Sequence, residues 1–333
     1  MQAPNFWRGP GPSVASLLLS PAAHIYGLLG RIRNNFSVPW RASVPVICIG
    51  NLVAGGAGKT PVVLKLIDML KQRGIKPHAL SRGYGGTLTG PMQVDPSRHN
   101  YRETGDEPLL LAKHAPTWIA KDRVLGAQAA TEAATDAEAI IMDDGFQNPA
   151  LAKDLSLVVV DGNYGFGNGH LIPAGPLRES IKDGLRRAHA VVLIGADSAG
   201  VEDSIRQHGR DDLPVLRATI KPGPEADALK RQTVHAFAGI GEPEKFFRTL
   251  EDLGCTVVAR TPFADHHPYS AAEIEALKTD ARQQNAVLVT TEKDAVRVPE
   301  NVRDGIKVLT ITLEWDDEAG VNKLLDQLEF DGR

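Results

Sequence analysis

Short apolar runs alternate with helix-like segments along the first two thirds of the chain. Val46–Ile49 is an apolar run between Pro45 and Gly50, which is typical of a buried parallel strand. Further strands are expected at residues 139–142, 157–160 and 191–194, and helices at residues 61–73, 107–115 and 124–133. Strands that alternate with helices predict an α/β fold, with a parallel sheet covered by helices on both faces.

A second, smaller α/β domain is expected after a linker rich in proline and glycine at residues 221–224. Its strands are predicted at residues 235–238, 256–259, 287–290 and 308–312, and its helices at residues 242–253 and 271–283. The chain is therefore divided into an N-terminal segment (1–35), a larger domain (36–223) and a smaller domain (224–333). Whether the C-terminal helix near residues 321–328 packs back on the larger domain stays open.

The N-terminal segment is apolar and basic. Residues 13–30 are apolar but interrupted by Pro21 and His24, and Arg31 and Arg33 follow. One interpretation is a helix packed on the core. The other is a pair of interfacial helices that dips into a bilayer and is held by basic flanks. No apolar run reaches the ~18 residues that suggest a membrane-spanning helix, and no cleavable signal peptide is expected.

Composition narrows the possible functions. The 333 residues include 37 basic and 41 acidic side chains, a balance that gives no reason to expect a nucleic-acid partner. The two cysteines, Cys48 and Cys255, lie far apart, so a disulfide scaffold is excluded and a reducing compartment is favoured. The charge is uneven, because the first acidic residue is Asp68 and six basic residues precede it. A cationic, apolar beginning suits an anionic membrane surface and anionic substrates.

The strongest single signal is the glycine-rich segment Gly55–Thr60, which lies between a predicted strand and a predicted helix. Backbone N–H groups in such a loop face an anion, Lys59 reaches the phosphates, and the Thr60 hydroxyl binds Mg²⁺. The full pattern has glycine where this chain has Val53, whereas the Gly-x-Gly-Lys-Thr part is intact. Nucleotide phosphates are therefore expected on a loop made of Val53, Ala54, Gly55, Gly56, Ala57, Gly58, Lys59 and Thr60.

A pair of acidic residues, Asp143 and Asp144, follows the apolar run at residues 139–142. The carboxyl end of a parallel strand is where open sheets bind ligands, and phosphoryl transfer needs a carboxylate that holds Mg²⁺. In a chain with a phosphate loop this interpretation outweighs a solvated turn. The spacing does not decide which aspartate leads.

Two further segments allow more than one interpretation. Asp106 lies in Gly105–Pro108 at the start of a predicted helix, and from spacing alone a helix cap is favoured over a general base. His266 lies in Asp265–His267, where the alternatives are exposed loop histidines or a histidine that orients a carboxylate across a cleft. A zinc site is not supported, because no further ligands stand at metal spacing.

Three other charged residues are candidates. Arg82, in the glycine-rich segment 81–86, either holds a phosphate or belongs to a flexible surface loop. Glu179 ends a stiff loop at residues 173–179 and is a candidate carboxylate at the metal or behind it. Arg123 belongs to a charged run that is either a solvated face or a set of cations facing an anionic substrate.

Thr291–Asp294 resembles a guanine-reading motif, but Lys293 and Asp294 are adjacent, which is the wrong spacing. Binding of GTP is therefore not inferred.

Taken in order, these motifs resemble the tetraacyldisaccharide 4′-kinases, the lipid A 4′-kinases of Gram-negative bacteria. The resemblance covers nearly the whole chain and is carried by residues 50–52, 55–61, 80–86, 105–108, 143–147, 173–179, 263–267 and 291–294. It implies a phosphate-loop fold of two α/β domains with a cleft between them. It also implies phosphorylation, with ATP and Mg²⁺, of the 4′-hydroxyl of a membrane-embedded tetraacyl disaccharide 1-phosphate, giving lipid IVA. The expected place is the cytoplasmic face of the inner membrane, with the protein peripheral or monotopic and no obligate protein partner inferred.

Matched residue by residue, the resemblance implies phosphate and metal binding by Lys59 and Thr60, metal binding by Asp143, Asp144 and Glu179, and catalysis by Asp106 with His266 as its partner. This reverses the interpretation of Asp106 as a helix cap. The sequence departs from the family at Val53-Ala54, where threonine is common, and at Ala57, where a polar residue is more usual. Because Lys59 and Thr60 are intact, ATP binding is still expected.

Two rival functions remain open from the sequence. A soluble phosphate-loop kinase or ligase acting on a small metabolite explains the loop and the acidic pair, but it gives the apolar N-terminal segment no use. A nucleotide switch for metal insertion or protein targeting usually reads guanine and often carries Cys and His clusters, and neither is visible.

Overall fold

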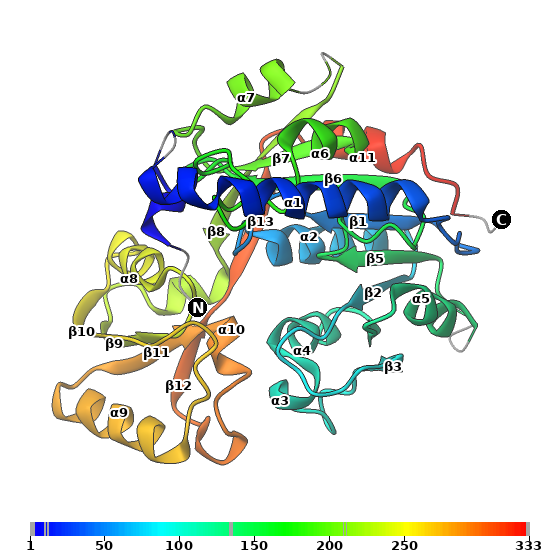
Figure 1. The fold of residues 1–333 in the computed structure, drawn as a ribbon. Helices are drawn as coiled ribbons and strands as arrows, with labels where there is room; N and C mark the ends of the chain where they lie inside the picture. The colour runs from blue at the N-terminus through cyan, green and yellow to red at the C-terminus, as the bar shows by residue number, and fades with distance from the viewer. Residues whose placement is uncertain are drawn as a thin grey trace.

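The computed structural model describes residues 4–9, 11, 13–132, 136–208, 210 and 212–330, which form two sheets with helices around them (Figure 1). In spatial order the larger sheet consists of β13 (Ile311–Trp315), β8 (Val215–Pro222), β7 (Ala190–Ile194), β6 (Leu155–Asp161), β1 (Val46–Gly50), β5 (Ala139–Asp143), β2 (Pro77–Ser81), β4 (Thr117–Ile119) and β3 (Met92–Gln93). Neighbouring strands are parallel except at the two edges, where β13 is antiparallel to β8 and β3 to β4. The predicted parallel sheet is confirmed.

Helices cover both faces of this sheet, because its strands bury both sets of side chains. In β1, Ile47 and Ile49 belong to the core on one face, whereas Val46 and Cys48 belong to the core on the other. The first face is covered by α2 (Lys59–Gln72), α4 (Asp106–Ala112) and α11 (Glu318–Leu325). The second is covered by α5 (Arg123–Glu132), α6 (Ile181–Arg187) and α7 (Val201–His208). The short α3 (Tyr101–Thr104) precedes α4.

The smaller sheet is entirely parallel. Its order is β10 (Thr256–Pro262), β9 (Thr233–Ala238), β11 (Val287–Thr291) and β12 (Ile306–Leu309). Its helices are α8 (Pro243–Asp252), which packs on one face, α9 (Ala271–Gln283), which packs on the other, and the short α10 (Glu292–Ala295). Short 3₁₀ turns lie at Asn5–Trp7, Pro224–Ala228 and Glu300–Val302.

One strand prediction was wrong. Residues 308–312 do not form a single strand, because β12 ends in the smaller sheet and β13 begins in the larger one. Leu309 is buried in the core of the smaller unit and Leu313 in that of the larger. At the crossing, Thr310 accepts a hydrogen bond from the Gly223 N–H (2.8 Å), so the two chain connections between the sheets are tied together. An apolar run that passes between two cores gives no sign of the change of sheet.

The C-terminal helix α11 packs on the larger sheet. Val321 and Leu325 are buried beside Leu313 in the same core as α2. This settles the question that the sequence left open, and Figure 1 shows the chain returning from the smaller sheet to the larger one before it ends.

The N-terminal segment forms one continuous helix, α1 (Val14–Phe36), so of the two alternatives, a single helix or a pair of helices, the pair is excluded. Pro21 lies inside α1, where it cannot donate a backbone hydrogen bond. One side of α1 packs on the rest of the protein, since Ser16 and Ala23 are buried. The Asn168 amide donates a hydrogen bond to the Ser16 hydroxyl (3.0 Å). Within the described part of the chain, no helix is both long and apolar enough to cross a membrane.

Candidate active site

The phosphate loop joins β1 to α2. Gly58 is the N-cap of α2 in a left-handed conformation (φ 78°), and Gly55 has φ 122°. Both angles favour glycine, and they turn the backbone between strand and helix into the cradle typical of phosphate loops. The Asn51 amide donates to the Gly55 carbonyl (3.2 Å) and supports the loop from beneath. The predicted order of strand, loop and helix is therefore confirmed.

Val53 has a structural reason to replace glycine. It forms an antiparallel bridge with Leu177, and the next N–H, of Ala54, donates to the Pro176 carbonyl (2.7 Å). Extended, buried backbone suits a β-branched residue. Ala57 is also buried, whereas Gly55 and Gly56 are exposed. The beginning of the loop is thus packed against the stiff loop at residues 173–179, and the anion-facing part stays open.

The acidic pair lies at the carboxyl end of β5, next to the phosphate loop. Asp144 has a positive φ of 49°, and its Oδ1 lies 3.5 Å from Lys59 Nζ and accepts a hydrogen bond from Arg178 Nη1 (2.8 Å). Burial opposes the charge on Asp144, but Lys59 and Arg178 lower its pKa. Asp143 is 5% exposed, and its buried Oδ1 has no hydrogen-bond partner among the residues that the structure describes. Burial raises the pKa of Asp143 to about 6.

Glu179 lies behind this pair and has partners on both oxygens. Gln147 donates to its Oε1 (3.0 Å), and Arg187 pairs with its Oε2. The same Gln147 amide donates to the Asn51 carbonyl (2.9 Å), which connects Glu179 to the base of the phosphate loop.

The two arginines predicted to contact substrate differ in exposure. Arg82 is exposed. Arg123 is 4% exposed, and its Nη1 donates to the Ala120 carbonyl (2.6 Å). Burial, followed by the charge of Arg82, lowers the pKa of Arg123. Arg123 is therefore fixed to the main chain beside the site, and its contact with a substrate stays a prediction.

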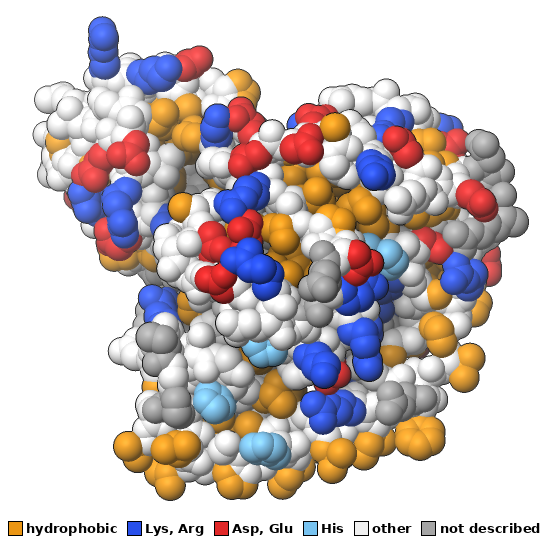
Figure 2. Space-filling view, turned by 90° about the horizontal axis from the view of Figure 1, so that it is seen from above, with side chains coloured by type: hydrophobic (Ala, Val, Ile, Leu, Met, Phe, Trp, Pro, Cys, Tyr) orange, Lys and Arg blue, Asp and Glu red, His pale blue; other side chains and the backbone are white. Residues whose placement is uncertain are grey.

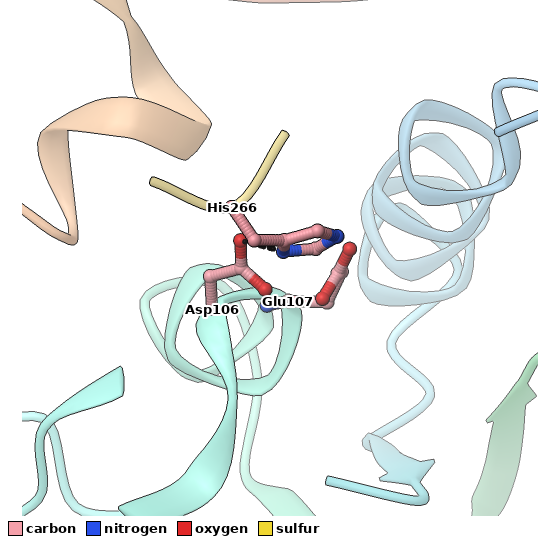
Figure 3. Close-up of side chains that lie close together, drawn as sticks. All are labelled: Asp106, Glu107 and His266. Atoms are coloured by element: carbon pink, nitrogen blue, oxygen red, sulfur yellow. Dashed lines mark hydrogen bonds and ion pairs between the residues drawn. The ribbon is translucent and has the colours of Figure 1, made fainter. Parts of the chain in front are cut away.

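Asp106 and His266 meet although 160 residues separate them. Asp106 is the first residue of α4 beside the larger sheet, and His266 lies in the loop after β10 of the smaller sheet. The His266 ring is bonded through Nδ1 to Asp106 Oδ2 (2.9 Å), as Figure 3 shows. The hydrogen bond raises the pKa of His266. Burial works against the charge of Asp106, but His266, the Glu107 side chain and Lys293 hold its pKa well below the usual range.

The backbone on each side of this contact is specialised. His266 has φ 59°, a left-handed conformation that non-glycine residues adopt at a cost. Gly105 has φ 88°, and a Cβ there would lie 2.4 Å from the Tyr84 carbonyl oxygen. The close approach of two chain segments thus sets where Asp106 begins its helix.

Two basic residues near Asp106 were not predicted to belong to the site. Lys293 Nζ lies 3.9 Å and Arg297 Nε 3.8 Å from Asp106 Oδ2. Lys293 lies in Thr291–Asp294, a segment that resembles a nucleotide-base motif but has the wrong spacing for one.

Asp106, Glu107 and His266 are close enough to hold a metal ion, since one ligand atom of each lies within 4.8 Å of the others. Lys293 Nζ already lies 2.7 Å from Glu107 and supplies the positive charge there. The cluster is an ion-pair network, and we assign no metal to it.

A parallel sheet, a phosphate loop that opens a helix, and a carboxylate at the end of the neighbouring strand define a phosphate-loop kinase. A sequence model of the family described as tetraacyldisaccharide-1-P 4′-kinase matches residues 15–329. The chain belongs to this family and is a kinase.

Individual relatives agree along the full chain. The tetraacyldisaccharide 4′-kinase of Rhodospirillum centenum is 55% identical over 333 residues, which cover 98% of this chain and 97% of the relative. That of Rhodospirillum rubrum is 52% identical over 328 residues, with 98% of each chain covered. A crystal structure of LpxK from Aquifex aeolicus in complex with ATP superimposes with a TM-score of 0.76 at 28% identity, covering 94% of this chain and 98% of that one.

Proposed function

We propose that this protein transfers the γ-phosphoryl group of ATP to the 4′-hydroxyl of a tetraacyl disaccharide 1-phosphate at a membrane surface. The single observation that carries the proposal is the meeting of Asp106 and His266, from two different sheets, in a chain that also presents a phosphate loop. The family membership and the relatives' printed names supply the substrate class.

The residues around the loop fit a nucleotide with Mg²⁺. Lys59 and the glycines would hold the phosphates, and Thr60, Asp143 and Asp144 would hold the ion. The observation that favours this is the buried Asp143 Oδ1, which has no partner within the described part of the chain, because such an oxygen is costly unless it gains a ligand. We place Glu179 behind the ion, since both its oxygens already have partners. When bound, Mg²⁺ neutralises charge on the phosphates.

The chemical step is an in-line displacement. The sugar oxygen forms a bond to the γ-phosphorus while the bond from phosphorus to the β,γ-bridging oxygen breaks, and ADP leaves with that electron pair. Lys59 stabilises the charge that develops on the transferred group. The proton of the sugar hydroxyl passes to the Asp106–His266 pair. Asp106 orients the hydroxyl, and His266 supplies the basicity that the depressed pKa of Asp106 lacks.

Helix α1 provides the surface for a membrane-embedded substrate. Large apolar side chains remain exposed on α1 and just after it: Val14, Leu17, Leu18, Ile25, Tyr26, Leu28, Leu29, Ile32, Phe36 and Val38. Figure 2 shows hydrophobic side chains gathered along the lower edge of the molecule, where α1 lies, with basic side chains just above them. Exposed apolar area of this extent favours an interface, and the basic residues favour an anionic one. We propose peripheral binding to the inner membrane, from its cytoplasmic face, through α1.

The test is phosphate transfer to lipid. Purified protein is incubated with γ-labelled ATP and tetraacyl disaccharide 1-phosphate in mixed micelles, and Lys59→Ala serves as the control. The proposal expects a labelled lipid with two phosphates, formed by the unaltered protein and lost in the variant. Label that stays in water-soluble products would favour a kinase acting on a small metabolite instead.

A further inference from the structure

We propose that Lys293 is a positioning residue that holds the Asp106–Glu107 carboxylates in place from the opposite sheet and so completes the site. This inference rests on the proposed function, because it concerns how the same acceptor site is assembled. It gives a role to the segment Thr291–Asp294, which the phosphate-loop chemistry leaves unused.

Lys293 reaches both carboxylates at once. Its Nζ lies 2.7 Å from Glu107 Oε1 and 3.9 Å from Asp106 Oδ2, and its side chain is 30% exposed. The two carboxylates are adjacent on α4, so without a cation between them they would repel each other. The shared ammonium is therefore a bridge from α10 to the first turn of α4. A second, longer ion pair, Lys113 to Glu292 (3.8 Å), joins the same two helices.

The backbone that presents Lys293 is firmly held. The Thr291 hydroxyl accepts a hydrogen bond from the Asp294 N–H (3.1 Å) and caps α10. Asp294 is fully buried and accepts hydrogen bonds from the Gly239 N–H (2.9 Å) and the Tyr269 hydroxyl (2.8 Å). Because these hydrogen bonds fix the backbone of α10, they also fix the position from which the Lys293 side chain reaches α4.

Arg297 plays a different part. It is 1% exposed and is bound to Asp294 (2.6 Å) and to the Gly239 carbonyl (2.9 Å). Removing it would leave Asp294 buried and unpaired, which destabilises proteins strongly. Arg297 therefore belongs to the scaffold of the smaller unit, and Lys293 is the residue whose removal tests the positioning role.

The sign of the expected effect follows from the charges around the pair. Among the described residues, the charged and titratable groups that face Asp106 and His266 come from four segments: Glu107 from α4, Asp265 from the His266 loop, Tyr84 from the loop after β2, and Lys293 and Arg297 from α10 and the residues after it. The bond to Asp106 raises the pKa of His266, burial raises the pKa of Glu107 to about 7, and the charge of Lys293 opposes both shifts. Loss of its charge therefore moves both titrations to higher pH.

The experiment compares Lys293→Met, Lys293→Arg and the control Lys307→Met, which removes an exposed lysine from β12 of the same sheet. Activity on the tetraacyl disaccharide is measured from acid to alkaline pH. In Lys293→Met we expect kcat at neutral pH to fall about tenfold or more, the KM for ATP to stay within about twofold, and the acid limb of kcat to move up by about half a pH unit or more. Lys293→Arg is expected to restore the position of the limb, and Lys307→Met to match the unaltered enzyme.

A normal kcat in Lys293→Met, or a reduced kcat with an unmoved acid limb and no rescue by arginine, would overturn the proposal. If Lys293→Met does not fold, Lys293→Gln replaces it. Failure of the unaltered enzyme to phosphorylate the lipid would instead contradict the proposed function. Even then, an NMR titration of the His266 ring tests the inference, because its pKa rises in the variant if Lys293 faces the pair and stays the same if it does not.

Discussion

At the scale of single residues, the candidate site is built around a buried carboxylate, Asp106. Basic side chains of the smaller unit balance its negative charge. Asp106 is 3% exposed, and its Oδ2 faces His266, Lys293 and Arg297, all from the smaller unit. A carboxylate in such surroundings stays ionised at all physiological pH values, so it is a weak base but a well-fixed hydrogen-bond acceptor. The pKa of His266 is raised by its hydrogen bond to Asp106, and within the pair it is the His266 ring that takes up the proton.

A pH dependence follows from this assignment. The pKa of His266 is raised above 6.5 by its bond to Asp106, so below that raised pKa the ring already holds a proton and the pair cannot accept another. We expect kcat to rise with pH through a midpoint above 6.5. In Asp106→Asn the kcat is expected to fall by about 10²-fold or more, and the midpoint to move toward lower pH. The measurement is kcat against pH for both proteins, and a limb that does not move in Asp106→Asn would remove the pair from the mechanism.

At the scale of elements, loops at strand ends hold the candidate site residues, and α1 carries the proposed membrane contact. The phosphate loop and Asp143 follow neighbouring parallel strands, β1 and β5, whose carboxyl ends lie side by side. Asp106 depends on a tighter feature, because Gly105 lies against the Tyr84 carbonyl in a conformation that glycine favours.

Gly105→Ala tests that placement. The new Cβ would meet a backbone oxygen at 2.4 Å in addition to the positive φ, so α4 must shift. We expect a loss of about 1–3 kcal/mol in the free energy of unfolding and a fall in kcat of about tenfold or more. The matched control is Gly74→Ala, which has φ 79° but no atom within 4 Å, and should lose stability while keeping kcat. Urea unfolding and steady-state kinetics measure both, and equal kcat values for the two variants would contradict the account.

Helix α1 is tested by placing charges on its apolar side. Leu18 and Leu29 are 78% and 62% exposed, so glutamate at both sites should leave the fold intact. We expect binding to anionic vesicles to weaken at least about tenfold, since each leucine that enters an apolar layer contributes about 1.5–3 kcal/mol. ATP binding should not change. Val258→Glu, at an exposed apolar residue on β10, is the control. Equal sedimentation of all forms with vesicles would exclude α1 as the membrane contact.

At the scale of the whole molecule, the chain passes from the larger sheet to the smaller one and back again. The candidate site takes residues from both units. The chain leaves the larger sheet after β8, builds the smaller sheet, and returns as β13 and α11. The crossings are joined by the bond between Gly223 and Thr310, close to the point where the two units are connected. Because β13 and α11 pack in the core of the larger unit, the smaller unit that carries His266 and Lys293 is connected to the larger sheet at both of its ends.

The return of α11 makes a stability prediction. Leu325 is fully buried in the core of the larger unit, whereas Leu277 of α9 belongs to the core of the smaller. We expect Leu325→Ala to cost about 2–5 kcal/mol in the free energy of unfolding and to speed hydrogen exchange in α2. Leu277→Ala should speed exchange in the smaller sheet instead. Exchange that rises in the smaller unit alone after Leu325→Ala would contradict the packing of α11.

The sequence predicts what is local and misses what is distant. The phosphate loop, Asp143 and the alternation of strands and helices follow from neighbouring residues, so the sequence pattern alone locates them. Asp106 and His266 were assigned only through family resemblance, since no spacing rule connects residues 160 positions apart. Lys293 received no role for the same reason. The change of sheet at Thr310 was also missed, because it depends on which core a side chain enters. Whether the N-terminal segment forms one helix or two stayed open, and the structure has one helix, α1.

The most direct test of the account is the position of the phosphate that the enzyme adds. Tetraacyl disaccharide 1-phosphate is converted with ATP and Mg²⁺, and the lipid product is analysed by phosphorus–proton correlation NMR. The account predicts a second phosphate on the 4′-oxygen, formed in step with one ADP per lipid, and none with Lys59→Ala. A phosphate on another hydroxyl, or ATP consumed with the lipid unchanged, would contradict it.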